Sequence, residues 1–273
     1  MITAGVVGVT GRLGHAILKR LEHNGIRVVL TASGTDGWHG QEVPDVLVDA
    51  SGPGAWEAVA GYCRRNRIPL LECVSDLDPG AVAGLAEQVP VLHATNLALG
   101  HHVQRKLITR LAQLLGDTGE ATVWERHPST KAHRPSATAV LLAQEWGGRV
   151  GEIASRRSGL AVSEHELTVT LAGETVSIRH EVGDLAAAAA GAVLAVRWLP
   201  GRSAGRYSMS AVYESKDWTD EHDTADRAGG LRGADAVAGR ARRLQPGADL
   251  GPAAGHGHVP DQERVVWLRR GDA

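Results

Sequence analysis

Residues 2–14 decide the fold, and they read Ile2-Thr3-Ala4-Gly5-Val6-Val7-Gly8-Val9-Thr10-Gly11-Arg12-Leu13-Gly14. The apolar run up to Val9 is bounded by glycine, which predicts a buried parallel strand. Apolar residues then recur at helical spacing over 15–21, and Gly25 supplies a helix stop. Residues 26–33 predict a second strand. A strand, a glycine-rich turn, a helix and a strand in this order predict the start of a dinucleotide-binding domain.

The glycine-rich turn has the chemistry of a phosphate-binding loop. Gly8 allows a tight turn, Gly11 lets the backbone approach a pyrophosphate, and Gly14 lets the helix pack on the strand. The start of the helix offers free N–H groups and a positive dipole end to phosphate. The spacing differs from the common Gly-x-Gly-x-x-Gly, and an ordinary glycine turn is the alternative. The cofactor residues expected here are Gly8, Thr10, Gly11, Arg12, Leu13 and Gly14.

The end of the second strand bears on the choice of cofactor. NAD-type sites usually carry an acid there to hold the ribose 2′-OH, but the first acid in this chain is Asp36. An uncharged, hydroxyl-bearing strand end with Ser33 tolerates a 2′-phosphate, and Arg12, within the glycine-rich loop, is the nearest guanidinium that could pair with it. A solvated cation at the start of the helix is the other interpretation of Arg12. We expect NADPH or NADH, with NADPH preferred.

The rest of the chain shows two different orders of predicted strands and helices. Further strands are predicted over 45–51, 68–74 and 89–94, with helices between and after them, so the fold class is α/β with a Rossmann-type doubly wound parallel sheet. From Glu120 the pattern changes to a strand, a helix over 136–146, and a hairpin with period-2 alternation over 164–180. These elements predict a second α+β domain on a mixed or antiparallel sheet.

Composition narrows the classes of partner and location. The net charge is -2 and the pI is about 6.7, which gives no sign of a nucleic-acid partner. There is no apolar run long enough to span a membrane and no signal-peptide pattern. The two cysteines do not form a disulfide framework, so we expect a cytoplasmic protein with a small-molecule substrate.

The stretch 125–139 reads Glu-Arg-His-Pro-Ser-Thr-Lys-Ala-His-Arg-Pro-Ser-Ala-Thr-Ala. It resembles the signature of dihydrodipicolinate reductases, Glu-x-His-His-x-x-Lys-x-Asp-x-Pro-Ser-Gly-Thr-Ala. The resemblance implies that His127 is the catalytic acid and that Lys131 is a proton donor that also binds substrate. It further implies that Ser136, Ala137 and Thr138 hold a substrate carboxylate at the start of a helix.

The resemblance extends over about residues 1–213. It implies that Ser51, Cys73 and Asn96 lie at the cofactor, although Asn96 is equally suited to bond the backbone of its own turn. It implies a dinucleotide-binding domain over 1–118, a domain for substrate binding and oligomerisation over 119–200, and a closing segment over 201–215. Residues 216–273 lie beyond it and predict a loosely ordered tail.

Several positions depart from the family pattern. Pro128, His133 and Ala137 replace a histidine, an aspartate and a glycine, and Leu185 lies near the place of a missing arginine. Glu72 replaces a glycine beside the expected nicotinamide, where it either alters substrate binding or faces solvent. These changes favour a substrate that differs from the family's dicarboxylate. Arg126, Arg134 or His133 are possible replacement cations.

The sequence therefore predicts an NAD(P)H-dependent reductase that transfers hydride to a small cyclic imine or conjugated enamine amino acid. One alternative is a genuine 4-hydroxy-tetrahydrodipicolinate reductase of lysine biosynthesis. A second is a dinucleotide-binding homologue without catalysis. The resemblance implies a homo-oligomer, a tetramer through the sheet of the second domain, and we expect no metal site.

Overall fold

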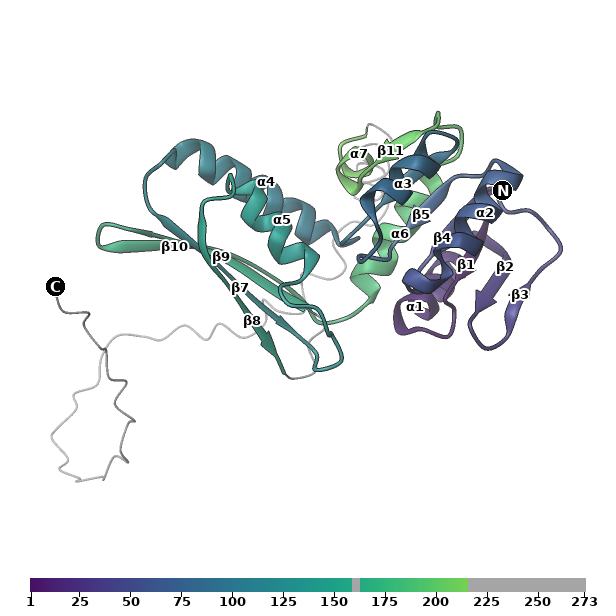
Figure 1. Ribbon diagram of the computed structural model, residues 1–273, viewed down its shortest axis with the longest axis horizontal. Helices are drawn as coiled ribbons and strands as arrows, with labels where there is room; N and C mark the ends of the chain where they lie inside the picture. Colours follow the sequence, from purple (N-terminus) through teal and green to yellow (C-terminus); the bar gives the residue numbers. More distant parts are fainter. Residues whose placement is uncertain (159–162, 216–273) are drawn as a thin grey trace, which may run out of the picture. The chain divides into compact units, whose positions relative to one another are not determined.

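A computed structural model describes residues 1–158 and 163–215 of the chain (Figure 1). The predicted tail over 216–273 lies outside the described residues. Within them the chain forms two sheets with helices packed on them, as expected for an α/β protein. None of the described helices is long and apolar enough to cross a bilayer.

The first sheet has seven strands in the order β11-β6-β5-β4-β1-β2-β3. All its pairs are parallel except β2 with β3, so the segment 34–44 between β2 and β4 contains an antiparallel edge strand. The strands are β1 (Thr3–Val7), β2 (Arg27–Ser33), β3 (Gly37–His39), β4 (Val46–Asp49), β5 (Leu70–Glu72), β6 (Pro90–His93) and β11 (Gly205–Tyr207).

Two hydrophobic clusters cover the two faces of this sheet. On one face lie α1 (Arg12–His23), α6 (Ala186–Trp198) and α7 (Met209–Tyr213). On the other lie η1 (Pro53–Ala55), α2 (Trp56–Asn66) and α3 (Pro79–Ala86). Helix α3 lies between the strands predicted over 68–74 and 89–94, where a helix was expected without bounds. Asp78 followed by Pro79 is its start signal, and the Asp78 carboxylate accepts a hydrogen bond from the N–H of Ala81.

The second sheet has the order β10-β9-β7-β8, and only its β7–β8 pair is parallel. Its strands are β7 (Glu120–His127), β8 (Val150–Arg157), β9 (Ser163–Leu171) and β10 (Glu174–Val182). Alternate residues such as Val123, Leu167 and Val169 point to one face, where they pack with α4 (Leu99–Leu115) and α5 (Ala137–Glu145). The predicted hairpin is therefore present as β9 and β10.

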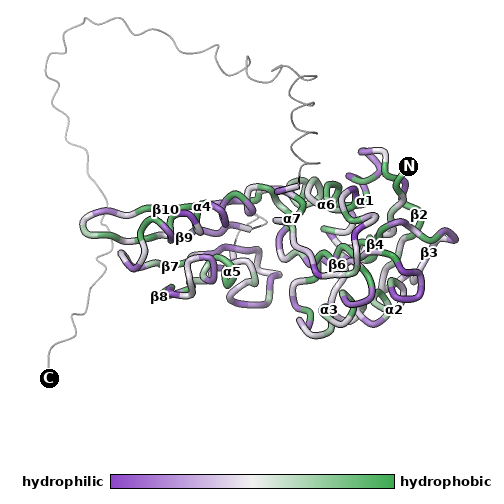
Figure 2. Tube along the Cα trace, turned by 90° about the horizontal axis from the view of Figure 1, so that it is seen from above, coloured by the Kyte–Doolittle hydropathy of each residue, from purple (hydrophilic) through white to green (hydrophobic). Residues whose placement is uncertain are grey.

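The chain returns to the first sheet after β10. Helix α6, which falls inside the segment 119–200, is apolar along its length and packs on α1 (Figure 2). Strand β11 then pairs with β6 at the edge of the first sheet. We propose that the first domain comprises residues 1–118 together with α6, β11 and α7.

Helix α6 packs so closely at Gly191 that this position has no room for a side chain. A Cβ at this position would overlap the carbonyl oxygen of Leu97, which also accepts a hydrogen bond from the Tyr213 hydroxyl at 2.6 Å. We expect Gly191→Ala to lower the free energy of unfolding by about 1–3 kcal/mol, because backbone must move to admit the methyl group. Urea denaturation measures it.

The matched control is Gly84→Ala in α3, where a Cβ would meet no atom within 4 Å. There the same change should raise stability by about 0.5–1 kcal/mol, since Ala is the better helix former. Equal effects at the two positions would contradict the packing seen around Gly191.

Candidate functional site

The glycine-rich turn brings three elements into close contact at the carboxyl edge of the first sheet. Gly8 has φ +86°, and a Cβ on it would lie 2.6 Å from the carbonyl oxygen of Ala50. A Cβ on Gly14 would overlap the carbonyl oxygen of Gly8, so α1 packs directly on the end of β1. Gly11 precedes the first residue of α1, which leaves the N–H groups of this helix end facing the edge of the sheet. This backbone fits the phosphates of a dinucleotide.

A pocket of about 310 Å³ lies beside this turn, at the ends of β1, β2 and β4. It is lined by three expected cofactor residues, Gly8, Ser33 and Ser51, together with Trp38 and Ala58. Its place at the carboxyl ends of parallel strands fits the adenosine half of a dinucleotide.

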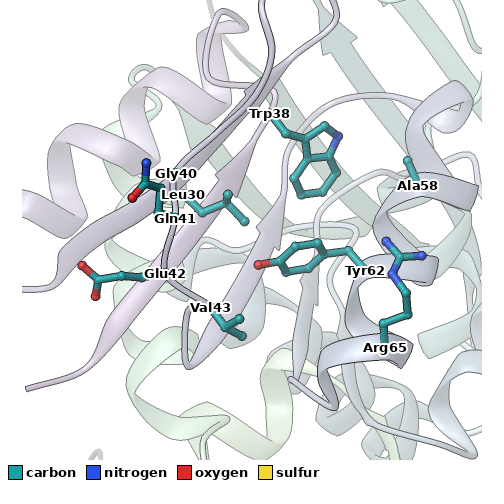
Figure 3. A pocket seen from close by; sticks show the side chains of 9 residues that line it. All are labelled: Leu30, Trp38, Gly40, Gln41, Glu42, Val43, Ala58, Tyr62 and Arg65. Carbon is teal, nitrogen blue, oxygen red and sulfur yellow. The ribbon is translucent and has the colours of Figure 1, made fainter.

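The sequence analysis gave Trp38 no role, but the structure makes it a wall of this pocket. Its indole stacks on the Tyr62 ring with 5.1 Å between the ring centroids, and it also lines a second hollow of about 320 Å³ (Figure 3). The indole thus separates the two spaces. A tryptophan in a glycine-rich stretch does not by itself indicate that its side chain lines a pocket.

A smaller pocket of about 130 Å³ lies at the ends of β5 and β6. It brings together the expected cofactor residues Leu13, Cys73 and Asn96 with Ser163 and Leu185 from beyond residue 118. The Asn96 side chain accepts a hydrogen bond from the N–H of Ala98 at 3.0 Å, so it bonds the backbone of its own turn. Six of the ten expected cofactor residues therefore line these two pockets.

The end of β2 is not as uncharged as the sequence suggested. The Ser33 hydroxyl donates to the Asp36 carboxylate at 2.8 Å, and the Asp36 N–H donates back to Ser33 at 2.9 Å. Hydrogen bonds from Ser33 and Thr35 lower the pKa of Asp36. An ionised carboxylate therefore lies beside Ser33, which weakens the argument that this strand end favours a 2′-phosphate.

The second half of the site is built around Glu125 near the end of β7. This carboxylate is 0% exposed and accepts hydrogen bonds from the Ser136 N–H at 3.1 Å, the Ser136 hydroxyl, Ser155 Oγ at 2.7 Å and Arg157 Nη1 at 3.0 Å. Burial acts to raise its pKa, but the bonds from Ser136, Ser155 and Arg157 outweigh it, so the pKa of Glu125 lies below its ordinary value.

Arg157 is the functional-site residue that sequence reasoning missed. It ends β8 in register with His127, and its side chain is 3% exposed. Besides Glu125, it donates from Nε to the carbonyl oxygen of Lys131 at 2.8 Å and from Nη2 to that of His133. One guanidinium therefore fixes the loop that carries Lys131. Arg156 and Arg157 are adjacent at a strand end, and the sequence does not indicate which of the two side chains is buried.

The expected catalytic residues lie on either side of this anchor. His127 Nδ1 is 3.4 Å from Glu125 Oε2, and its ring centroid lies 5.0 Å from that of His165. Burial lowers the pKa of His127, although Glu125 opposes the shift. Lys131 is half-buried in the loop that follows. His127 Nδ1 has no hydrogen-bond partner within the described residues, so the carboxylate lies beside the imidazole and, through Arg157, holds the backbone of the Lys131 loop.

The expected substrate residues divide into two kinds. The Ser136 hydroxyl is buried, and it caps α5 by accepting a bond from the Ala139 N–H at 3.2 Å. Thr138 is also buried. Ala137 lines a pocket of about 410 Å³ together with Thr95 and Arg134. The start of α5 therefore faces a space that a small ligand can enter.

The possible replacement cations also separate. Arg126 is paired with Glu164 at 2.8 Å and with Glu181 at 3.4 Å, so it is already committed. His133 and Arg134 line the pocket with Ala137. His133 Nε2 lies 3.2 Å from the carboxylate of Asp76, which lines the same pocket.

Glu125, His127 and His165 are the group in the described part of the chain whose ligand atoms could hold a metal ion, lying within 4.8 Å of one another. The Arg157 guanidinium and the Ser136 hydroxyl already occupy the carboxylate, and a fixed cation beside it repels a second one. The chemistry of these donors therefore fits a hydrogen-bonded anchor better than a metal centre.

Comparisons with known proteins agree with this architecture. Residues 100–213 match the family model described as dihydrodipicolinate reductase, C-terminus. A 4-hydroxy-tetrahydrodipicolinate reductase from Alkalilimnicola ehrlichii is 31% identical over 235 residues, which cover 77% of this chain and 82% of the relative. The chain belongs to the dihydrodipicolinate reductase family. It is thus an oxidoreductase that reduces a C=N or C=C bond with NAD(P)H.

Other members of the dihydrodipicolinate reductase family support the assignment. A 4-hydroxy-tetrahydrodipicolinate reductase from Thermosipho africanus is 27% identical over 211 residues, covering 76% of this chain and 96% of the relative. Among solved structures, a dipicolinate-bound dihydrodipicolinate reductase from Paenisporosarcina sp. TG-14 aligns with a TM-score of 0.61 at 16% identity, covering 76% of this chain and 97% of that one. This structural alignment shows that the two proteins share a fold.

The buried anchor yields a test by substitution. Arg157→Ala removes the guanidinium that faces Glu125 and leaves two loop carbonyls without their donor. We expect a loss of about 3–5 kcal/mol in the free energy of unfolding, as for other broken buried pairs. The exposed neighbour Arg156→Ala should stay within about 0.5 kcal/mol. Guanidinium denaturation compares the two, and equal losses would refute the anchor.

The buried imidazole beside the anchor predicts a pH effect on stability. Burial, reinforced by neighbouring histidines, lowers the pKa of His165 to about 3 in the folded chain. Below its ordinary value of about 6.5 the unfolded chain binds this proton first, so stability falls as pH falls from 6.5 towards 3. We expect His165→Asn to reduce the proton uptake on unfolding by about one in this window. An unchanged slope of the unfolding free energy against pH would exclude a buried neutral imidazole.

Proposed function

We propose that the protein transfers hydride from NAD(P)H to a small cyclic imine or conjugated enamine amino acid. The observation that carries the proposal is the shared anchor of the two catalytic candidates. Glu125 lies beside the His127 imidazole and binds Arg157, which in turn holds the loop of Lys131. A site that had lost its function would have no need of a buried, hydrogen-bonded carboxylate behind these two side chains.

The cofactor supplies the hydride when it is bound, with its phosphates at the turn of residues 8–14 and its nicotinamide end at the pocket of Cys73 and Asn96. The roles of the chain's own residues follow from their positions. The N–H groups at the start of α5 and the Ala137 pocket hold a substrate carboxylate. Lys131 offsets the negative charge that develops on the reduced group, and His127 or Lys131 gives it a proton.

The structure supports a substrate that differs from the family's dicarboxylate. The N–H groups at the start of α5 are still present, but the Ala137 methyl group narrows the space beside them. Leu185 places an apolar side chain at the pocket of Cys73 and Asn96. His133 and Arg134 are the cations beside Ala137. We therefore propose one carboxylate or an altered ring substituent. A genuine 4-hydroxy-tetrahydrodipicolinate reductase of lysine biosynthesis is the second candidate, favoured by the names of the relatives.

The choice between the two cofactors rests on two residues. Arg12 at the start of α1 supports NADPH, whereas the Asp36 carboxylate beside Ser33 supports NADH. Because Asp36 is already fixed by hydrogen bonds at the strand end, we propose that NADH is accepted alongside NADPH. Repeating the assay below with each cofactor, and with Asp36→Ala, measures the preference.

The proposal also includes the oligomeric state and the location of the protein. Strand β10 is an edge of the second sheet and exposes most of its residues, including Val176, which supports a homo-oligomer through this sheet. Light scattering of the intact chain measures the assembly. Both cysteines are free, which supports the expected cytoplasmic location.

Two substitutions test the catalytic assignment. We expect His127→Ala and Lys131→Ala each to lower kcat by about 10²–10⁴-fold, because each removes a proton donor or a positioned charge. Cofactor affinity, measured by calorimetry, should stay unchanged, since neither side chain lies at the dinucleotide pockets described above. Thr130→Ala in the same loop is the control, because Thr130 is exposed. Full activity in both variants would disprove the assignment and favour a homologue without catalysis.

The substrate is tested by NADPH oxidation with two ligands side by side. One is freshly generated 4-hydroxy-tetrahydrodipicolinate, and the other is a six-membered cyclic imine with one carboxylate. We expect the monocarboxylate to have the higher kcat/KM. Efficient turnover of the dicarboxylate would instead identify the enzyme of lysine biosynthesis.

A further inference from the structure

Two buried carboxyl groups lie at the cofactor edge of the first sheet and have no part in the chemistry above. Asp49 ends β4 and Glu72 ends β5, and the two residues face each other in the parallel register. Leu47 and Leu70, two residues earlier on the same strands, pack under α2 and α3, so both carboxyls point to that face of the sheet. Asp49 is 1% exposed and Glu72 is 0% exposed. Of the two interpretations of Glu72, the one in which it faces solvent is therefore wrong.

Each carboxyl has one oxygen that is satisfied locally and one that is not. Asp49 Oδ1 accepts from the Ser51 N–H at 2.9 Å and from its hydroxyl at 2.5 Å, and Glu72 Oε1 accepts from the Val74 N–H at 2.7 Å. Within the described residues, Asp49 Oδ2 and Glu72 Oε2 have no hydrogen-bond partner. Two neighbouring carboxylates out of water cannot both be ionised at low cost. A single proton supplies the missing donor and removes the repulsion.

Among residues 1–158 and 163–215, the titratable groups that face the pair supply no compensating cation. From α2, Cys63 faces it, and burial followed by Glu72 and Asp49 raises the pKa of that thiol to about 12. Cys73 follows on β5, where burial and then the same two carboxyls raise the thiol pKa. On β6, His93 is in register with Glu72, its Nε2 lies 3.0 Å from the Val74 carbonyl oxygen, and burial lowers its pKa. Burial and then Asp49 raise the pKa of Glu72 to about 9.

The pair lies between the two halves of the dinucleotide site. Ser51, which bonds Asp49, lines the adenosine pocket, and Cys73, next to Glu72, lines the pocket at the nicotinamide end. We propose that Asp49 and Glu72 share one proton, and that this proton governs how the site discriminates between oxidised and reduced dinucleotide as pH changes. The proposal rests on the proposed function only for the placement of the nicotinamide end.

The physical reason is the charge of the ring. The oxidised nicotinamide carries one positive charge more than the reduced one, while the phosphates of the two forms are the same. When the pair loses its proton to solvent, the added negative charge attracts the oxidised ring and leaves the reduced ring unaffected. While the pair keeps its proton near neutral pH, the discrimination is smallest, and the oxidised product can leave after hydride transfer.

Calorimetric titration of the intact chain with NADP⁺ and with NADPH, from pH 7 to pH 10, tests this. We expect the ratio of the two dissociation constants to move by about tenfold in favour of NADP⁺ as pH rises, as for one charge acting through partly polar surroundings. Below the pKa of Glu72, binding of NADP⁺ should release a fraction of a proton more than binding of NADPH, seen in buffers of different ionisation enthalpy. In Glu72→Gln the ratio should be flat. Glu57→Gln, an exposed acid on α2, should keep the wild-type dependence.

A second variant and a cofactor-free measurement complete the test. Asp49→Asn should move the change in the ratio to lower pH, because Glu72 then loses its proton without repulsion from a second carboxylate. Without cofactor, the folded chain holds one proton more than the unfolded chain between the ordinary pKa of Glu72 and about 9, so stability falls with rising pH there. Glu72→Gln should remove that contribution.

The measurements distinguish failure of the shared-proton proposal from failure of the proposed function. A wild-type ratio that does not change with pH, or an unchanged dependence in both variants, would overturn the shared proton while leaving the reductase proposal intact. If neither dinucleotide binds at any pH, the proposed function falls together with this inference. Loss of the pH dependence in Glu72→Gln alone, with Asp49→Asn unchanged, would overturn the sharing.

Discussion

The buried carboxylate of Glu125 is the interaction on which the second half of the molecule depends. A charge with no exposed surface is costly, and it is tolerated because donors from two segments, the start of α5 and strand β8, converge on it. Ser136 fixes the start of α5, Ser155 fixes β8, and Arg157 carries the contact on to the loop of Lys131. Removing the charge would therefore release a helix end, a strand and the loop of Lys131 together.

The second sheet is organised in layers as a result. Val123, Leu167 and Val169 form an apolar layer under α4 and α5. Two residues further along the strands, the same face becomes polar, with Glu125 in register with both Ser155 and His165. The site is thus a continuation of the hydrophobic core in which the side chains have changed chemistry. Its geometry inherits the rigidity of the strands, which suits a reaction that needs fixed donors.

Much of this could be predicted from local sequence. The glycine turn, the strands that follow it and the β9–β10 hairpin have periodicities that depend on neighbouring residues, and His127 and Lys131 belong to a short motif. Arg157, Trp38 and the burial of Glu72 could not be predicted in this way. Each depends on which strand lies beside which, and a strand-end arginine, tryptophan or glutamate looks the same in sequence whether it faces solvent or a partner. The Asp36 contact was missed for a related reason, because a three-residue turn folds it back onto Ser33.

The path of the chain through the first domain has a consequence for how the protein is made. Helix α6 and the segment around Tyr213 fill the same core as Ala4 and Ile17. During synthesis the first sheet therefore emerges with one face covered only by α1, and its core closes only after the intervening domain has left the ribosome. Contacts between such distant parts of a chain form slowly. The exposed face is the surface that a chaperone would have to shield in the meantime.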